Sequence, residues 1–364
     1  MSQKFRSIIK NVKSRLTFRN IIFAIAIVGL ISLVSSSIPQ LKNLTQTIKD
    51  INLLILVLAI FPRVFSIFCQ AGYFKSIIIH DKKKPWPSLS HIAPFWTMNT
   101  INLLVPSGGI AGLKYMQTKL YPETKFSEVS SANFLFYIFN GLAIFSWLVV
   151  AFFSLIWSDN IDLISFKIVY IILGLLIVLM LLIILVTIAV DFFKNLTNLA
   201  LIPVEKLIKK FKPSFDREQA VTFINDHLDQ IHRLVVEDKN FLWPLGFAIM
   251  GVFADILTIA IVFWSLGDIL NIGIIIVAYS FALGSSVGSI FAGGVGIYET
   301  VMTTTFVTLG VPFSLALPGT LIYRLVSVWI PIIPGAYYYQ QYQNKLNQAA
   351  KVTKPKDDSS IQSS

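Results

Sequence analysis

The sequence predicts an all-α integral membrane protein with about six spanning helices and two re-entrant, broken helical hairpins arranged as an inverted repeat. The chain has 364 residues, of which 55% are hydrophobic and 13% are charged, whereas soluble domains carry about 25% charged residues. Its mean hydropathy is +0.71. Long apolar runs alternate with short basic loops, which is typical of multi-pass membrane proteins.

Six apolar runs are candidates to cross the bilayer, since a spanning helix needs about 20 apolar residues. They cover residues 21–38, 51–72, 131–156, 168–190, 244–266 and 315–339. The first run follows a basic segment that lacks acidic residues, a pattern that also describes a signal peptide. We expect an uncleaved signal-anchor helix there, because further spans follow it.

Two other apolar segments are too short and too broken to span. Residues 91–105 are interrupted by a proline and two asparagines and run into PSGGIAGLK, Pro106–Lys114. Residues 272–283 run into GSSVGSIFAGGVGIYE, Gly284–Glu299. Each glycine costs about 1 kcal/mol of helix propensity relative to alanine, and irregular backbone at membrane depth persists only where protein or a water-filled cavity satisfies it. We therefore predict two re-entrant hairpins, the second broken along Gly284–Glu299.

The basic residues predict the orientation. The segments expected to be cytoplasmic hold 25 of the 30 lysines and arginines, whereas the external loops hold only Lys42, Lys49 and Lys167. This asymmetry places both termini in the cytoplasm. The first hairpin then enters from the inside and the second from the outside, as expected of an inverted repeat.

The domain organisation is predicted to be simple. We expect residues 1–352 to form a single polytopic domain, with amphipathic helices on the cytoplasmic face in the polar segment 191–243. Residues 353–364 have the composition of a disordered cytoplasmic tail.

A short internal match supports the repeat. Gly108–Lys114 reads GGIAGLK and Gly293–Glu299 reads GGVGIYE. Both open on two glycines and an aliphatic residue and close on a charge, of opposite sign in the two copies. Broken elements at corresponding positions of two halves indicate a transporter binding site.

Charged residues inside the apolar segments are the first site candidates, because such residues are costly in a membrane and usually functional. Arg63 either snorkels or faces inward. Asp255 either belongs to a site or forms a structural ion pair with Arg63 or Arg324, and Glu299 is expected beside Arg324. Glycine turns also let backbone N–H groups approach an anionic headgroup. The candidate substrate-binding set is therefore completed by Gly293, Gly294, Gly296, Pro106, Ser107, Gly108, Gly109 and Lys114.

Other classes of protein find little support. A single cysteine, Cys69, excludes an internal disulfide and a cysteine-rich metal site. The four histidines lack the spacing of metal ligands, and the glycine-rich stretch lacks the lysine of a phosphate loop. The basic residues are spread between spans and form no patch for nucleic acid. We expect no enzymatic activity, no cofactor and no metal.

Three motifs resemble the membrane region of lysylphosphatidylglycerol synthases and its free-standing, flippase-like relatives. They are NLLVPSGGIAGLKYM (Asn102–Met116), GGVGIYE (Gly293–Glu299) and YRLVSVWIPIIPG (Tyr323–Gly335). The resemblance covers nearly the whole chain in the same order. Many relatives carry a glutamate soon after the first glycine turn, where this chain has Lys114.

The resemblance implies a lipid flippase that moves a phospholipid or other lipid-linked headgroup across a prokaryotic cell membrane. The synthases carry a soluble aminoacyl-transfer domain after the membrane part, and this chain stops at Ser364, so we expect translocation without lipid synthesis. The implied partners are membrane lipids, with a homo-oligomer or a lipid-modifying enzyme as further possibilities. The alternatives are a carrier for a soluble solute and a non-transporting scaffold for lipid or cell-envelope modification.

Overall fold

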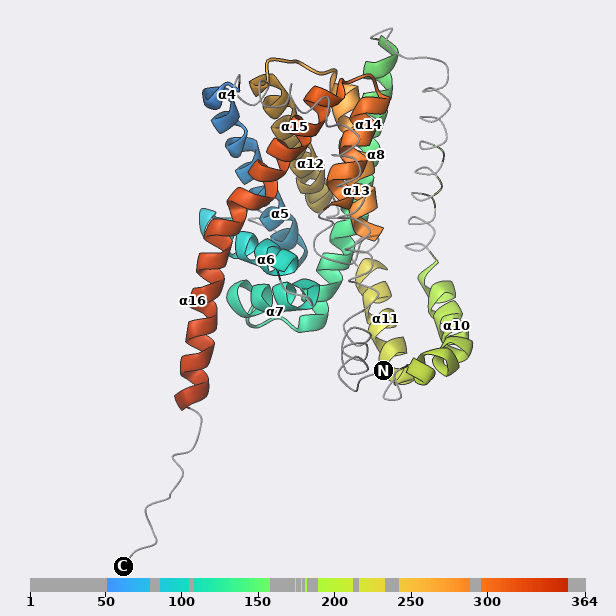
Figure 1. Cartoon of the computed structure of the whole chain (residues 1–364). Coiled ribbons are helices and arrows are strands. Elements are labelled where there is room, and N and C mark those ends of the chain that lie inside the picture. Colours follow the sequence, from blue (N-terminus) through green and yellow to red (C-terminus); the bar gives the residue numbers. More distant parts are fainter. Residues whose placement is uncertain are drawn as a thin grey trace, which may run out of the picture.

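The protein is an all-α membrane protein, and the described part of the chain contains only helices (Figure 1). The computed structural model describes residues 51–78, 86–104, 108–157, 174, 178, 181, 189–211, 216–232, 242–288 and 296–352. Among them, four helices are long and apolar enough to cross a membrane: Leu53–Ile78, Phe126–Trp157, Leu242–Ser265 and Phe313–Asn344. These correspond to four of the six predicted spans. The predicted spans 21–38 and 168–190 lie outside the described residues, apart from a few single positions of the second.

The elements of the two halves follow the same order. The first half contains α4 (Leu53–Leu58), α5 (Ile60–Ile78), α6 (Ile92–Leu104), α7 (Gly108–Leu120) and α8 (Phe126–Trp157). The second contains α12 (Leu242–Ser265), α13 (Ile272–Gly288), α14 (Ile297–Thr308), α15 (Phe313–Arg324), the π-helical turn Leu325–Trp329 and α16 (Ile330–Val352). Between the halves lie α10 (Val190–Phe211) and α11 (Arg217–His232).

Both predicted hairpins are present. The short helices α6 and α7 pack against each other, and so do α13 and α14. One boundary was wrong, because α13 continues through Gly284 to Gly288. Packing of α13 between α8 and α14 offsets the low helix propensity of its glycines. The return into α14 begins at Gly296, whose φ of 90° is a conformation that glycine adopts at little cost.

The packing of the halves supports the inverted repeat. The corresponding helices α5 and α12 form the largest contact of the fold. They run in opposite directions, since the Asn52 N–H at the start of α4 donates to the Ser265 carbonyl at the end of α12 at 2.8 Å. Moreover, α6 packs on α16 and α13 packs on α8, so each hairpin packs against a long helix of the other half.

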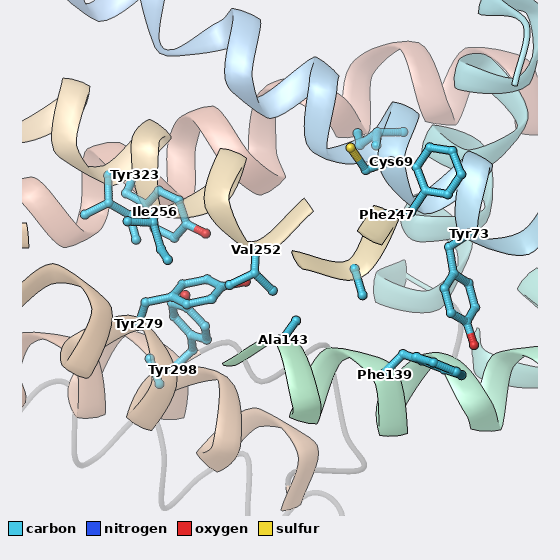
Figure 2. Close-up of a cluster of buried hydrophobic side chains, with 14 of the residues drawn as sticks. Cys69, Tyr73, Phe139, Ala143, Phe247, Val252, Ile256, Tyr279, Tyr298 and Tyr323 are labelled. Atoms are coloured by element: carbon cyan, nitrogen blue, oxygen red, sulfur yellow. The ribbon is translucent and has the colours of Figure 1, made fainter. Parts of the chain in front are cut away.

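Aromatic side chains fill much of the core between the halves. Figure 2 shows Tyr279, Tyr298 and Tyr323 gathered near Ile256, and Tyr73 farther along the cluster. All five side chains are buried. The three gathered tyrosines bring hydroxyl groups into the apolar interior between α12, α13, α14 and α15, where the charged residues described below also lie.

The polar segment between the halves forms the two amphipathic helices expected from the sequence. Helix α10 packs on α11, which in turn contacts α8, and both lie toward the same end of the molecule as α7 (Figure 1). Lys194 on α10 forms an ion pair with Asp229 on α11. Phe192 and Leu199 on α10 are 62% and 68% exposed, as expected for a helix that lies on a membrane surface.

Gly335 is expected to be essential for the contact between α16 and α6. A Cβ atom there would lie 2.0 Å from Thr100 Oγ1 and 2.9 Å from the Trp96 carbonyl oxygen. Gly335→Ala should therefore lower the free energy of unfolding by about 1–3 kcal/mol through overpacking, measured by thermal or denaturant unfolding of the purified protein. Gly141→Ala on α8 is the matched control, since a Cβ there meets nothing within 4 Å; equal effects of the two changes would contradict the prediction.

Candidate functional site

A π-helical turn interrupts the closing span beside the site. Within Leu325–Trp329 the helix widens, and the Ile330 N–H donates to the Leu325 carbonyl five residues earlier. The sequence provides a reason, because Pro331 lacks a backbone donor and cannot complete the regular α-helical pattern. Such turns occur often at functional sites. This one follows Arg324 directly and contains the buried Ser327.

Glu299 and Arg324 form a buried ion pair. Arg324 Nε donates to Glu299 Oε1 at 2.5 Å, and the Gly296 N–H donates to Glu299 Oε2 at 2.6 Å. Glu299 is 6% exposed and Arg324 is 7% exposed. The Arg324 guanidinium also lies over the ring of Tyr298, 4.6 Å from its centroid. The pair joins α14, the second helix of its hairpin, to the closing span.

A second ion pair links the corresponding helices α5 and α12. Arg63 Nη1 donates to Asp255 Oδ1 at 2.8 Å, so Arg63 faces inward and its partner is Asp255. The hydroxyl of Tyr279 on α13 donates to Asp255 Oδ2 at 3.0 Å. Each of the two carboxylates therefore accepts one hydrogen bond on each oxygen, one of them from an arginine.

Both arginines reach a single cavity of about 180 Å³ between the first hairpin and the closing span. One wall is α6 and the other is the π turn with the start of α16. The lining residues are Arg63, Trp96, Asn99, Thr100, Asn102, Arg324, Ser327, Val328, Pro331 and Ile332. Because the cavity lies against two helices of spanning length, we place it at membrane depth.

Several buried polar atoms on the lining residues have no hydrogen-bond partner among the described residues. They are Arg63 Nε, Arg324 Nη2, Trp96 Nε1, Asn102 Oδ1 and Ser327 Oγ. Buried polar groups in proteins are nearly always hydrogen-bonded, so each exception needs an explanation. They lie on residues that line the cavity, so polar groups without a described partner gather around it.

The structure brings only some of the predicted site residues together. Arg63 and Arg324 line the cavity, with Asp255 and Glu299 directly behind them, and Gly296 holds Glu299. Lys114 and Gly109 are exposed on α7 and do not line the cavity, and Gly108 begins that helix. The candidates Pro106, Ser107, Gly293 and Gly294 lie outside the described residues.

The charges that close the two matching motifs do not take equivalent places. Helix α7 starts at Gly108, the first residue of its motif, whereas α14 starts at Ile297, after the fourth residue of its motif. Glu299 therefore sits in the first turn of its helix, where its carboxylate caps the Gly296 N–H. Lys114 sits farther along its helix and points to the surface.

Sequence reasoning missed the wall that α6 contributes. Asn99 and Asn102 are three residues apart in an apolar segment, a spacing that puts them on one helical face. The two asparagines predict that the segment is broken. In the structure they also form a polar helical face toward the cavity. Trp96 lies on the same face, three residues before Asn99, and gives no polar signal of its own.

The family model for the lysylphosphatidylglycerol synthase TM region matches residues 21–335. The chain belongs to this family. The matched region includes both hairpins, both ion pairs and every residue that lines the cavity. Membership links the chain to membrane lipid handling.

A curated relative belongs to an archaeon. The UPF0104 membrane protein PH1989 of Pyrococcus horikoshii is 25% identical over 176 residues. The match covers 46% of this chain and 52% of that protein, so the chain spans about half the length of the relative. No solved structure matches the chain.

Proposed function

We propose that the protein is a lipid transporter that moves a lipid-linked headgroup across the cell membrane through the cavity between α6 and the closing span. The observation that carries the proposal is the cavity itself, which is lined by two ion-paired arginines and by polar residues whose buried atoms have no partner among the described residues. Buried charges at membrane depth are costly and usually mark a substrate pathway. The family's link to lipid handling supports a lipid as the substrate.

The mechanism follows from the two hairpins. In inverted-repeat transporters, the site lies near the bilayer midplane at the repeat interface, and one half moves relative to the other. Here each hairpin packs on the long helix of the other half. A shift of the halves would expose the cavity to one side at a time, while the acyl chains stay in the bilayer. No bond is made or broken, so the proposed role is transport without enzymatic chemistry.

The orientation is part of the proposal. The positive-inside pattern places both termini and the α10–α11 helices in the cytoplasm. The α6–α7 hairpin then enters the membrane from the cytoplasmic side and the α13–α14 hairpin from the external side. Helices α7 and α10 lie toward the same end of the molecule in Figure 1.

Arg324→Lys is the variant that tests this role. Lysine keeps a positive charge beside Glu299 but lacks the forked donors of the guanidinium. In vesicles that contain the purified protein and a trace of head-labelled phosphatidylglycerol, we expect the wild type to make the inner label accessible to an external quencher. Because a hydrogen bond to a charged group is lost, the rate of transport by Arg324→Lys should be lower than that of the wild type by about tenfold or more.

The matched control is Lys209→Gln on the surface helix α10. Lys209 does not line the cavity, so this variant should leave the rate of lipid transport unchanged. Wild-type vesicles that exchange label no faster than protein-free vesicles would contradict the proposed function. An Arg324→Lys rate equal to that of the wild type would contradict the assignment of the site.

A further inference from the structure

On the residues that line the cavity, buried donors without a described partner outnumber buried acceptors in the same state. Guanidinium and indole nitrogens can donate hydrogen bonds but cannot accept them. Arg63 Nε, Arg324 Nη2 and Trp96 Nε1 are all buried without a partner among the residues that the structure describes. Two neutral acceptors on the lining residues are also buried without a described partner, namely Asn102 Oδ1 and Ser327 Oγ. The hydroxyl of Ser327 can also donate.

The carboxylates beside the cavity are already engaged within the protein. Neither Asp255 nor Glu299 is among the lining residues. Both oxygens of Asp255 already accept hydrogen bonds, from Arg63 and Tyr279. Both oxygens of Glu299 accept hydrogen bonds from Arg324 and from the Gly296 N–H. An ammonium group in the cavity would meet two guanidinium groups, while the two carboxylates beside the cavity do not line it and are each paired with an arginine.

The arginines are held in place for an anion. Asp255 and Glu299 each hold one edge of a guanidinium, from α12 and α14 respectively. Arg63 on α5 and Arg324 at the end of α15 line the cavity from two different spans. Arginine binds phosphate through two parallel hydrogen bonds, and fixing its position beforehand reduces the entropy lost on binding.

The size of the cavity points to a headgroup. Pockets for drug-sized ligands occupy about 300–1,000 Å³, whereas this cavity has about 180 Å³. A phosphate with a small substituent suits that space better than a sugar-linked or peptide-linked headgroup. The lining residues Val328, Pro331 and Ile332 are apolar, so this part of the wall offers no group that would recognise a second charge.

We infer that the cavity takes the phosphate of an acidic lipid headgroup, such as phosphatidate or phosphatidylglycerol, and disfavours headgroups that carry an amine. This inference rests on the proposed function and specifies its substrate class. The shared chemistry is a phosphate anion, which a soluble phosphate ester also presents, so the experiment must separate the two sources.

Binding is to be measured with the purified full chain in detergent, as the shift in melting temperature with ligand concentration. The probes are dioctanoyl phosphatidate, dioctanoyl phosphatidylglycerol, dioctanoyl phosphatidylethanolamine, dioctanoyl lysylphosphatidylglycerol, dioctanoylglycerol and glycerol 3-phosphate. We expect both acidic lipids to bind at least about tenfold more tightly than the two amine-bearing lipids and the uncharged diglyceride. Glycerol 3-phosphate should bind more weakly than phosphatidate, because it lacks the acyl chains.

Two variants remove unpartnered groups from the cavity without touching either ion pair. Trp96→Phe and Ser327→Ala should each weaken phosphatidate binding by about three- to tenfold and leave the melting temperature without ligand close to that of the wild type. Trp264→Phe is the matched control, because Trp264 is 47% exposed at the end of α12 and does not line the cavity. It should bind phosphatidate as the wild type does.

The outcomes separate the inference from the proposed function. Tighter binding of either amine-bearing lipid than of phosphatidylglycerol would overturn the inference while leaving lipid transport in place. Equal affinity for glycerol 3-phosphate and phosphatidate would contradict the claim that the bound phosphate belongs to a lipid. Wild-type binding by both Trp96→Phe and Ser327→Ala would overturn the location. Failure of the proposed function would appear separately, as vesicles that exchange no labelled lipid.

Discussion

Glu299→Ala is expected to abolish lipid transport and to lower the free energy of unfolding by about 3–5 kcal/mol, because it leaves the Arg324 guanidinium buried without its carboxylate. Arg324 Nε is 2.5 Å from Glu299 Oε1, and the Gly296 N–H would lose its acceptor as well. Transport is measured in reconstituted vesicles and stability by thermal unfolding of the purified protein. The exposed ion pair between Lys209 and Glu205 provides the comparison: Lys209→Ala should cost about 0.5 kcal/mol or less.

A double variant separates a functional pair from a structural one. Glu299→Gln with Arg324→Met removes both charges and keeps an acceptor for the Gly296 N–H. Replacing a buried ion pair by neutral groups is often close to neutral for stability, so we expect the melting temperature to return toward that of the wild type. Transport should stay at background. A stable double variant that transports lipid at the wild-type rate would show that the pair serves only the fold.

Val328→Trp is expected to block transport by filling the cavity. Val328 lies in the π turn and forms part of the cavity wall, so a large ring there would occupy the space beside Arg324. Because the ring enters existing space, the free energy of unfolding should fall by no more than about 1–3 kcal/mol. The rate of exchange of labelled phosphatidylglycerol in vesicles is the measurement.

Val307→Trp on α14 makes the same chemical change on an exposed position. Val307 is 40% exposed and does not line the cavity, so this variant should transport lipid at the wild-type rate. If Val328→Trp also transported lipid at that rate, the cavity could not be the route of the headgroup.

The hairpins and the charged residues were predictable because their signals are local. Prolines, asparagines and clustered glycines mark segments that cannot span as regular helices, and a charge in an apolar run is visible at once. The structure confirms two short helices in each hairpin and pairs Glu299 with Arg324. Of the two partners considered for Asp255, the antiparallel packing of α5 on α12 selects Arg63.

The remaining features depend on tertiary contacts that a single sequence does not display. Helix α13 continues through Gly284 because neighbouring helices pack on it, which outweighs the intrinsic cost of glycine. Pro331 predicts a disturbance of the closing helix, but that it takes the form of a π turn is visible only in the structure. The cavity wall formed by α6 arises from packing on α16, and Trp96 lacks a signal that could have placed it there.

The π turn also has a consequence for how the closing span meets the lipid. Its exposed apolar side chains recur every four residues, at Leu321, Leu325, Trp329, Ile333 and Tyr337. An α-helix turns by about 100° per residue, so a four-residue spacing would drift around the helix by about 40° at each step. The π turn at Leu325–Trp329 holds more residues per turn, so each residue rotates by less there, which reduces the drift. One continuous apolar face can therefore contact the bilayer along the span, while the side of the helix that carries the buried Arg324 and Ser327 keeps facing the protein.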